Sequence, residues 1–246
     1  MKQNIQSAMQ YSADAIVAGK HGAPLISDER LLHLHAALLQ ATGSKPAKAK
    51  AAAAPAIRFP AVYASLLADL TPQDRITADI PLHLEPFTAT APLELSPEIA
   101  TGLAIGLAQN QPGSLVIAFT RAGRLQQDNF RQTLRTAARH QVPILYVLLP
   151  APSTFDWSAR AIREDVPCIP VDTHDAVALY RVAQETILRA RNHGGPSLID
   201  CKQVTLARGD SNPVTRLEAH LRRKGLLPTA LQSASRKSTS ATSRLA

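Results

Sequence analysis

The stretch from Ser114 to Ser153 decides the fold class. It begins Ser-Leu-Val-Ile-Ala-Phe-Thr-Arg-Ala-Gly at residues 114–123, and residues 143–150 read Pro-Ile-Leu-Tyr-Val-Leu-Leu-Pro. Both runs are short and apolar, as strands buried on both faces are. Between them lies a helix pattern that Asp128 can cap. Its apolar side chains share one face and are Phe130, Leu134, Ala137 and Ala138. Strand, helix and strand together predict a parallel crossover unit.

The carboxyl ends of these two strands are the expected ligand-binding region. In parallel sheets ligands bind at that edge, which here carries residues 120–123 (Thr-Arg-Ala-Gly) and 150–152 (Pro-Ala-Pro). Neither a Walker A run nor a clean Gly-x-Gly-x-x-Gly is present in the sequence. The pattern alone therefore predicts an α/β domain that can bind a nucleotide-like ligand at its switch point.

Composition sets the class of protein. The chain has 246 residues, 45% of them hydrophobic but only 4% aromatic, which predicts a globular fold with an aliphatic core. Its 2 cysteines, Cys168 and Cys201, lie in apolar contexts and are expected to be buried thiols in a reducing compartment. No run reaches membrane-spanning length and the first residues lack the order of a signal peptide, so we expect a cytoplasmic protein. The net charge of +8 is read as an aid to solubility.

Helix signals frame the central unit. Ser27 precedes a helix whose apolar face holds Leu31, Leu34, Leu38 and Ala41, and Thr173-His174-Asp175 precedes one over residues 176–191. Ser96-Pro97-Glu98 starts another, running to about Gln109. In that helix we expect Ile99, Leu103 and Leu107 to be buried, and Gly102 and Gly106 to allow close packing of another backbone. The segment after Pro152, which contains the only tryptophan, Trp157, reads as a loop.

The alternation of strands and helices predicts a doubly wound, mainly parallel sheet. The predicted organisation is an N-terminal helical segment at residues 1–43, a low-complexity linker or loop at 44–57, an α/β domain at 58–227 and a disordered tail at 228–246.

The second half of the chain resembles the alpha subunit of thiamine-diphosphate-dependent 2-oxo acid dehydrogenases, the pyruvate, branched-chain and acetoin enzymes. Residues 171–180 (Val-Asp-Thr-His-Asp-Ala-Val-Ala-Leu-Tyr) are similar to the family's Val-Asp-Gly-Asn-Asp-Val-x-Ala-Val-Tyr. Residues 189–191 and 195–200 are similar to its Arg-Ala-Arg and Gly-Pro-Thr-Leu-Ile-Glu. The resemblance extends from about residue 27 to 226 and implies the family's thiamine-diphosphate-binding fold.

The same resemblance implies that the cofactor positions have changed. The family holds a magnesium ion on the diphosphate with an aspartate after one strand and an asparagine after the next; the matching positions here are Arg121 and Pro150. Of the family's Tyr-Arg-x-His segment only His83 persists, and its diphosphate-contacting Arg-x-Gly-x-His-Ser loop has only a nearby Arg208. Arg121, His83 and Arg208 are thus the degenerate cofactor-binding candidates, with no catalytic or metal-binding residue expected and neither thiamine diphosphate nor magnesium expected.

Three functional hypotheses follow. The first is a non-catalytic relative of the alpha subunit that acts as a structural or regulatory partner of a beta-subunit-like chain, or that self-associates. The second is a working thiamine-diphosphate-dependent oxidoreductase component, which would need a substitute metal ligand such as Asp128, His83 or Asp210. The third is a module that binds an anionic ligand or nucleic acid through Arg121, Arg124, Arg131 and Arg135; for these arginines a solvated face is the default, and no membrane contact is expected.

Overall fold

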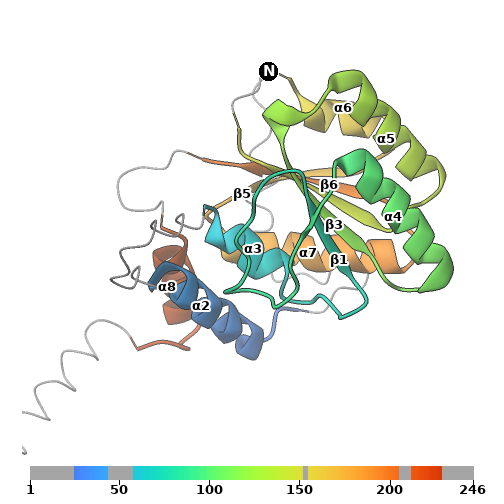
Figure 1. Cartoon of the computed structure of the whole chain (residues 1–246). Helices are drawn as coiled ribbons and strands as arrows, with labels where there is room; N and C mark the ends of the chain where they lie inside the picture. The colour runs from blue at the N-terminus through green and yellow to red at the C-terminus, as the bar shows by residue number, and fades with distance from the viewer. Residues whose placement is uncertain (1–24, 44–57, 152–154, 205–211, 229–246) are drawn as a thin grey trace, which may run out of the picture.

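A six-stranded, all-parallel sheet forms the centre of the molecule (Figure 1). The structure, a computed structural model, describes residues 25–43, 58–151, 155–204 and 212–228. The strand order is β2-β1-β3-β4-β6-β5, and every neighbouring pair is parallel. The strands are β1 (Arg75–Ala78), β2 (Leu93–Glu94), β3 (Val116–Arg121), β4 (Ile144–Leu149), β5 (Cys168–Asp172) and β6 (Ser197–Lys202). The predicted parallel α/β fold is confirmed.

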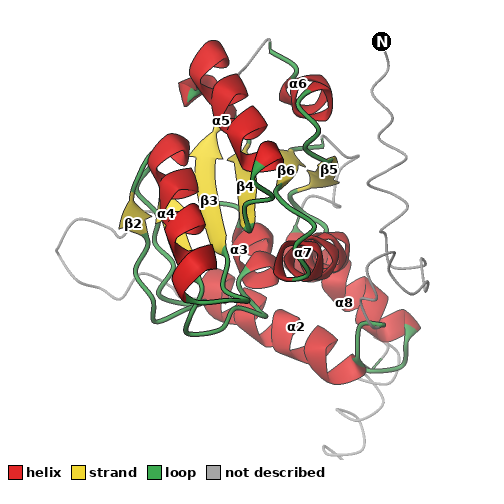
Figure 2. Cartoon of the chain, turned by 90° about the vertical axis from the view of Figure 1, so that its right-hand side faces the viewer, coloured by secondary structure: helices red, strands yellow, loops and turns green. Residues whose placement is uncertain are grey.

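Helices cover both faces of the sheet (Figure 2). On one face lie α3 (Pro60–Leu66) and α7 (Ala176–Arg191), with α2 (Asp28–Gly43) and α8 (Pro213–Arg223) packed against these two helices on the side away from the sheet. The apolar side chains of all four share one core cluster with alternate residues of the strands. The other face carries α4 (Pro97–Asn110), α5 (Gln127–Arg139) and α6 (Trp157–Arg163), which enclose a second cluster. The sheet is therefore the middle of three layers.

The central unit folds as its pattern predicts, apart from the helix cap. β3 and β4 pair in register from Val116 with Ile144 to Arg121 with Leu149, and the apolar side of α5 is buried against them through Phe130, Leu134 and Ala137. The prediction that Asp128 caps this helix is wrong. The N-cap is Gln126, and Asp128 lies inside the first turn with a side chain that is 92% exposed, where its charge faces the positive end of the helix dipole.

The buried face of α4 differs from the expected one. Ala100, Thr101 and Ala104 are its buried helical side chains after Pro97, whereas Ile99 is 59% exposed and Leu103 and Leu107 are half-buried. Small side chains let the helix pack close to β3, while the larger residues point along its flanks. The expected close packing on the glycines is also wrong within the described chain, because a Cβ at Gly102 or Gly106 would meet nothing within 4 Å.

The segment predicted as a loop after β4 contains helix α6. Asp156 begins it, and its Oδ1 accepts a hydrogen bond of 3.0 Å from the Ala159 N–H. Trp157 is 2% exposed, with its ring centroid 5.2 Å from that of Phe130. Both cysteines are free; Cys201 is buried as expected and Cys168 is half-buried.

Helix α2 packs on the same core as the sheet. Leu31, Leu34 and Leu38 are at most 2% exposed and belong to the cluster that contains α3, α7 and α8. The expected linker at 44–57 and all but the first residue of the expected tail at 228–246 lie outside the described residues, so the domain division stays a prediction. None of the helices in the described ranges combines the length and the hydropathy needed to span a bilayer.

Candidate functional site

The topological switch point lies between β1 and β3. From β1 the chain moves outward to β2 on one side, and from β3 it moves to β4 on the other. The segment after β1 packs Ile80 and Leu84 into the core on the α3 side of the sheet, whereas α4 and α5 lie on the opposite side. This divergence opens a crevice at the carboxyl edge, where parallel α/β sheets bind ligands.

Asp79 stands in this crevice, directly after β1. Its Oδ2 accepts a 2.7 Å hydrogen bond from the Thr120 hydroxyl at the end of β3. Its Oδ1 is buried and has no hydrogen-bond partner among the described residues. A pocket of about 280 Å3 opens beside it, and its polar lining residues are Asp79, Glu94, Ser96 and Arg124. The carboxyl edge thus presents mixed charge.

The described structure includes two of the three degenerate cofactor candidates, Arg121 and His83. Arg121 is the half-buried last residue of β3. His83 is exposed in the connection between β1 and β2. Arg208 lies outside the described residues. Their cofactor-binding role stays a prediction.

The residues at the expected metal position do not fit a magnesium ion. Magnesium takes oxygen ligands from carboxylates, carbonyl groups and water. The strand ends offer the cationic side chain of Arg121 and, after β4, Pro150, which has no side-chain oxygen. Of the proposed substitutes, Asp128 is on the surface of α5 and Asp210 falls in the undescribed segment. The described parts of the chain hold no group of three His, Cys, Asp or Glu side chains that could bind a metal.

The basic run of β3 and α5 is partly neutralised. Arg135 Nε lies 2.8 Å from Glu164 Oε2, and Arg131 Nε lies 4.0 Å from the other oxygen of the same carboxylate. Glu164 follows α6 and its side chain is 6% exposed. Of the four arginines in the hypothesised basic patch, Arg131 and Arg135 therefore pair with the buried Glu164. Arg121 and Arg124 form no ion pair within the described ranges.

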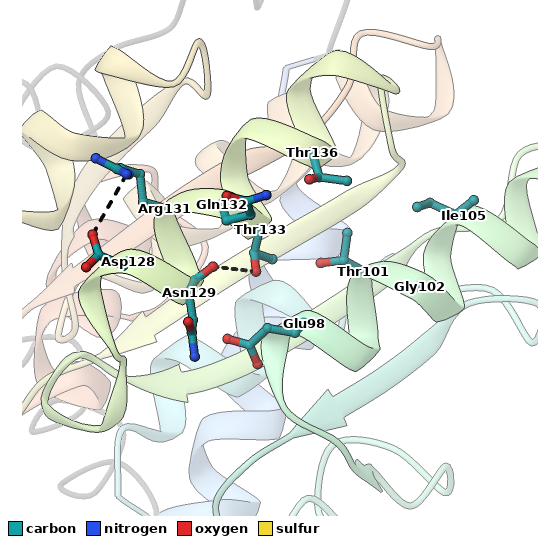
Figure 3. A pocket seen from close by; sticks show the side chains of 10 residues that line it. All are labelled: Glu98, Thr101, Gly102, Ile105, Asp128, Asn129, Arg131, Gln132, Thr133 and Thr136. Atoms are coloured by element: carbon teal, nitrogen blue, oxygen red, sulfur yellow. Dashed lines mark hydrogen bonds and ion pairs between the residues drawn. The ribbon is translucent and has the colours of Figure 1, made fainter.

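A second hollow lies between α4 and α5 (Figure 3). This groove has a volume of about 540 Å3 and is lined from α4 by Glu98, Thr101, Gly102 and Ile105 and from α5 by residues between Asp128 and Thr136. Figure 3 shows Glu98 at one end of the groove and the Arg131–Asp128 pair (3.9 Å) on the α5 side. Thr133 is held by its own helix, because its hydroxyl donates to the Asn129 carbonyl at 2.9 Å. The groove continues the exposed glycine side of α4.

Sequence reasoning missed Asp79. Its carboxylate accepts a hydrogen bond from Thr120, which is 41 residues away in the sequence. The one available signal was the position of Asp79, which directly follows the extended segment before Ile80.

Comparison with known proteins identifies relatives over part of the chain. No protein-family model matches. The alpha subunit of acetoin:2,6-dichlorophenolindophenol oxidoreductase from Bacillus subtilis is 32% identical over 114 residues, covering 42% of this chain and 34% of the relative. The pyruvate dehydrogenase E1 component subunit alpha of Staphylococcus aureus is 29% identical over 125 residues, covering 43% and 34%. The chain thus matches about a third of the length of these curated relatives.

Among solved structures, benzoylformate decarboxylase from Polynucleobacter necessarius is similar with a TM-score of 0.47 and 15% identity, covering 67% of this chain and 36% of that one. A transketolase variant from Pichia stipitis gives 0.46 and 14%, covering 74% and 37%. The resemblance seen in the sequence is confirmed by the curated relatives. Over the aligned residues, the chain is a homologue of the alpha subunits of acetoin oxidoreductases and pyruvate dehydrogenases.

Proposed function

We propose that this chain is a non-catalytic relative of the dehydrogenase alpha subunit, acting as the structural or regulatory partner of a beta-subunit-like chain. The observation that carries the proposal is the pair of residues at the carboxyl ends of β3 and β4. Arg121 and Pro150 stand where the family resemblance places an aspartate and an asparagine that bind magnesium. The scaffold around them is well packed, because β3 and β4 pair in register and the apolar side of α5 is buried.

The replacement of the two magnesium ligands by Arg121 and Pro150 strongly disfavours a bound metal ion at these strand ends. A guanidinium is cationic at every physiological pH and repels a divalent cation. Pro150 removes the second oxygen ligand, so a metal-bridged diphosphate would lose both of its protein anchors. The ends of β3 and β4 in this chain therefore offer no metal site for thiamine-dependent chemistry.

The partner surface that we propose is the exposed side of α4 with the adjoining groove on α5. Ile99 exposes a large apolar side chain, and Gly102 and Gly106 leave open space one turn apart. Glycines at this spacing allow the backbone of a second chain to approach closely. The curated relatives are named as alpha subunits, and this supports a beta-like chain as the occupant.

Calorimetric titration tests the loss of the cofactor. Thiamine diphosphate is titrated into the full chain with magnesium and, in a second run, with EDTA. We expect no magnesium-dependent heat at millimolar ligand. Saturable binding that appears with magnesium and disappears with EDTA would overturn the non-catalytic assignment and favour a working oxidoreductase component.

Co-purification tests the partner surface. The tagged chain is expressed in its native host, and bound chains are identified by mass spectrometry. We expect a beta-like chain with the wild type and its loss with Gly102→Leu, which fills open space without a clash in the isolated chain. Ala36→Leu on the exposed side of α2 is the matched control. If light scattering instead shows a dimer of this chain that Gly102→Leu dissociates, the occupant is a second copy and the beta-like partner is wrong.

A module for anionic ligands is the second candidate that an observation favours, because Arg121 and Arg124 lack recorded ion pairs in the described structure. Nucleic acid is the weaker form of this candidate, since Glu164 already binds Arg131 and Arg135. Strong, salt-dependent retention of the chain on DNA would favour it over the partner role.

A further inference from the structure

The pocket beside Asp79 brings together polar side chains from separate segments of the chain. They come from the end of β1, from β2, from the start of α4 and from the short helix η1 (Ala122–Arg124) that follows β3. These side chains belong to Asp79, Glu94, Ser96 and Arg124. Ala78, the last residue of β1, pairs with Glu94 of β2 and with Phe119 of β3. The parallel register of the sheet therefore assembles the pocket.

The Asp79 carboxylate is oriented by one hydrogen bond and has an acceptor to spare. Its Oδ2 accepts from the Thr120 hydroxyl at 2.7 Å, whereas Oδ1 is buried and has no hydrogen-bond partner among the described residues. A buried carboxylate oxygen without a donor costs free energy that a bound donor would recover. An ammonium group is a donor that also balances the negative charge.

Arg124 supplies the opposite charge in the same pocket. Arg124 and Asp79 both line it, yet Arg124 forms no ion pair within the described ranges, so the two charges are held apart. Helix η1 is fixed in place by Trp157, whose indole N–H donates to the Ala122 carbonyl at 3.2 Å. A carboxylate and a guanidinium that share a pocket without pairing match the two charged ends of a zwitterion.

The size and the apolar lining of the pocket restrict the ligand further. Its volume of about 280 Å3 is near the lower limit of roughly 300 Å3 for small-molecule sites. The apolar part of the lining consists of Ala78, Ile80, Pro81 and Leu95. A short aliphatic chain fits such a wall.

We propose that this pocket binds a small aliphatic amino acid, with its ammonium group on Asp79 and its carboxylate on Arg124. A guanidinium donates in a planar fork that matches a carboxylate. The exposed Glu94 offers a further acceptor for the three N–H donors of an ammonium group. The site goes beyond the proposed partner function and does not rest on it, because the pocket and the groove between α4 and α5 share no lining residue.

Calorimetric titration of the full chain with three matched probes tests the proposal. L-Norvaline carries both charged groups, butylamine lacks its carboxylate and pentanoate lacks its ammonium group. We expect L-norvaline to bind saturably and the other two to bind at least about tenfold more weakly, because each loses one charge-assisted contact. No binding of L-norvaline at concentrations up to about 10 mM would overturn the proposal. Equally tight binding of butylamine or pentanoate would also overturn it, because one of the two charged anchors would then be idle.

Variants locate the site. Asp79→Asn and the exposed Arg124→Gln should each weaken L-norvaline binding about tenfold or more. Arg124→Gln should also remove the preference for L-norvaline over butylamine. Asp165→Asn and Arg139→Gln change the net charge by the same amounts at exposed positions and should leave binding unchanged.

The thermal transition of each variant confirms that it is folded. Unchanged affinity in folded Arg124→Gln or Asp79→Asn would place the amino acid elsewhere and overturn the assignment. Losses of the same size in the two control variants would show that net charge alone accounts for the binding, and would overturn it too.

Discussion

Gly102 is a helix-interior glycine whose absent side chain is not required by the packing of this chain. Its backbone is helical within α4, and a Cβ there would contact nothing within 4 Å. Gly102→Ala should therefore raise the free energy of unfolding by about 0.5–1 kcal/mol, since alanine loses less backbone entropy in a helix. Urea unfolding of the isolated chain measures this change.

Gly195→Ala is the control for that substitution. Gly195 has φ +80°, and its Cβ would lie 3.3 Å from the Gln141 Cα, so alanine should cost about 1–2 kcal/mol there. A destabilising Gly102→Ala would show that some other part of the chain covers the exposed side of α4, contrary to the proposed partner surface.

Asp74 is a buried carboxylate with several hydrogen-bonding partners. Its side chain is fully buried and lies 2.7 Å from Arg191 Nη2. It also accepts hydrogen bonds from the Thr71 N–H and hydroxyl and from the Leu115 N–H. Asp74→Ala should lower the free energy of unfolding by about 3–5 kcal/mol, because it leaves a partly buried cation and several donors unpaired.

Asp28→Ala provides the comparison, because Asp28 pairs with Lys224 through a side chain that is 57% exposed. Chemical denaturation of both variants should show a loss below about 1 kcal/mol for this surface pair. Losses of similar size in the two variants would contradict the central role of Asp74.

At the scale of elements, periodicity in the sequence predicts those helices and strands whose apolar residues are large and regularly spaced. β3, β4 and α7 follow their patterns, and Asp175 begins α7 by accepting a hydrogen bond from the Ala178 N–H. Helix α6 has only 7 residues, too few for a periodic signal. The face of α4 was mistaken because close packing on β3 selects alanine and threonine over Ile99, a preference that depends on the neighbouring strand.

The candidate site shows the same limit. The strand ends at Arg121 and Pro150 could be placed from local patterns and from the family resemblance. The place of Asp79 could not, because its hydrogen bond with Thr120 joins the ends of β1 and β3 across 41 residues of sequence. Local pattern carries no information about which strand ends lie side by side.

The junction of β5, α7 and α8 should respond to pH. Burial raises the pKa of Asp175, although its hydrogen bond from Ala178 and the Arg216 guanidinium oppose that shift. A raised pKa means that the folded state binds this proton more tightly, so the contribution of Asp175 to stability falls as pH rises through its folded pKa. Asp175→Asn can still accept the cap hydrogen bond but does not titrate.

Urea unfolding between pH 4 and pH 7 measures this difference. The stability of Asp175→Asn relative to wild type should increase with pH across that range. Parallel pH profiles for the two proteins would show that the Asp175 proton is bound equally in the folded and unfolded chain, and the predicted linkage would be wrong.

At the scale of the whole molecule, the two faces of the sheet differ. The α3 side buries Ile80 and Leu84 of the segment after β1, and the α4 side carries the proposed partner surface. Both lie on elements that flank the switch point between β1 and β3. A partner docked on α4 would therefore contact the helix that leads directly into β3, the strand that ends in Arg121.

Helix α2 tests whether the layers unfold as one unit. Leu34 is 2% exposed in the core under α3 and α8, so Leu34→Ala should cost about 2–5 kcal/mol. Trp157, the only tryptophan, lies on the opposite side of the sheet, and its fluorescence reports unfolding of that distant layer. If α2 and the sheet form one cooperative unit, Leu34→Ala lowers the urea midpoint seen by Trp157 and by circular dichroism equally.

Leu39→Ala is the control, because Leu39 is half-exposed, and it should change the free energy of unfolding by less than about 1 kcal/mol. A Trp157 transition that stays at the wild-type midpoint while helicity is lost earlier would instead show that residues 1–43 form a separate folding segment, as the sequence alone predicts.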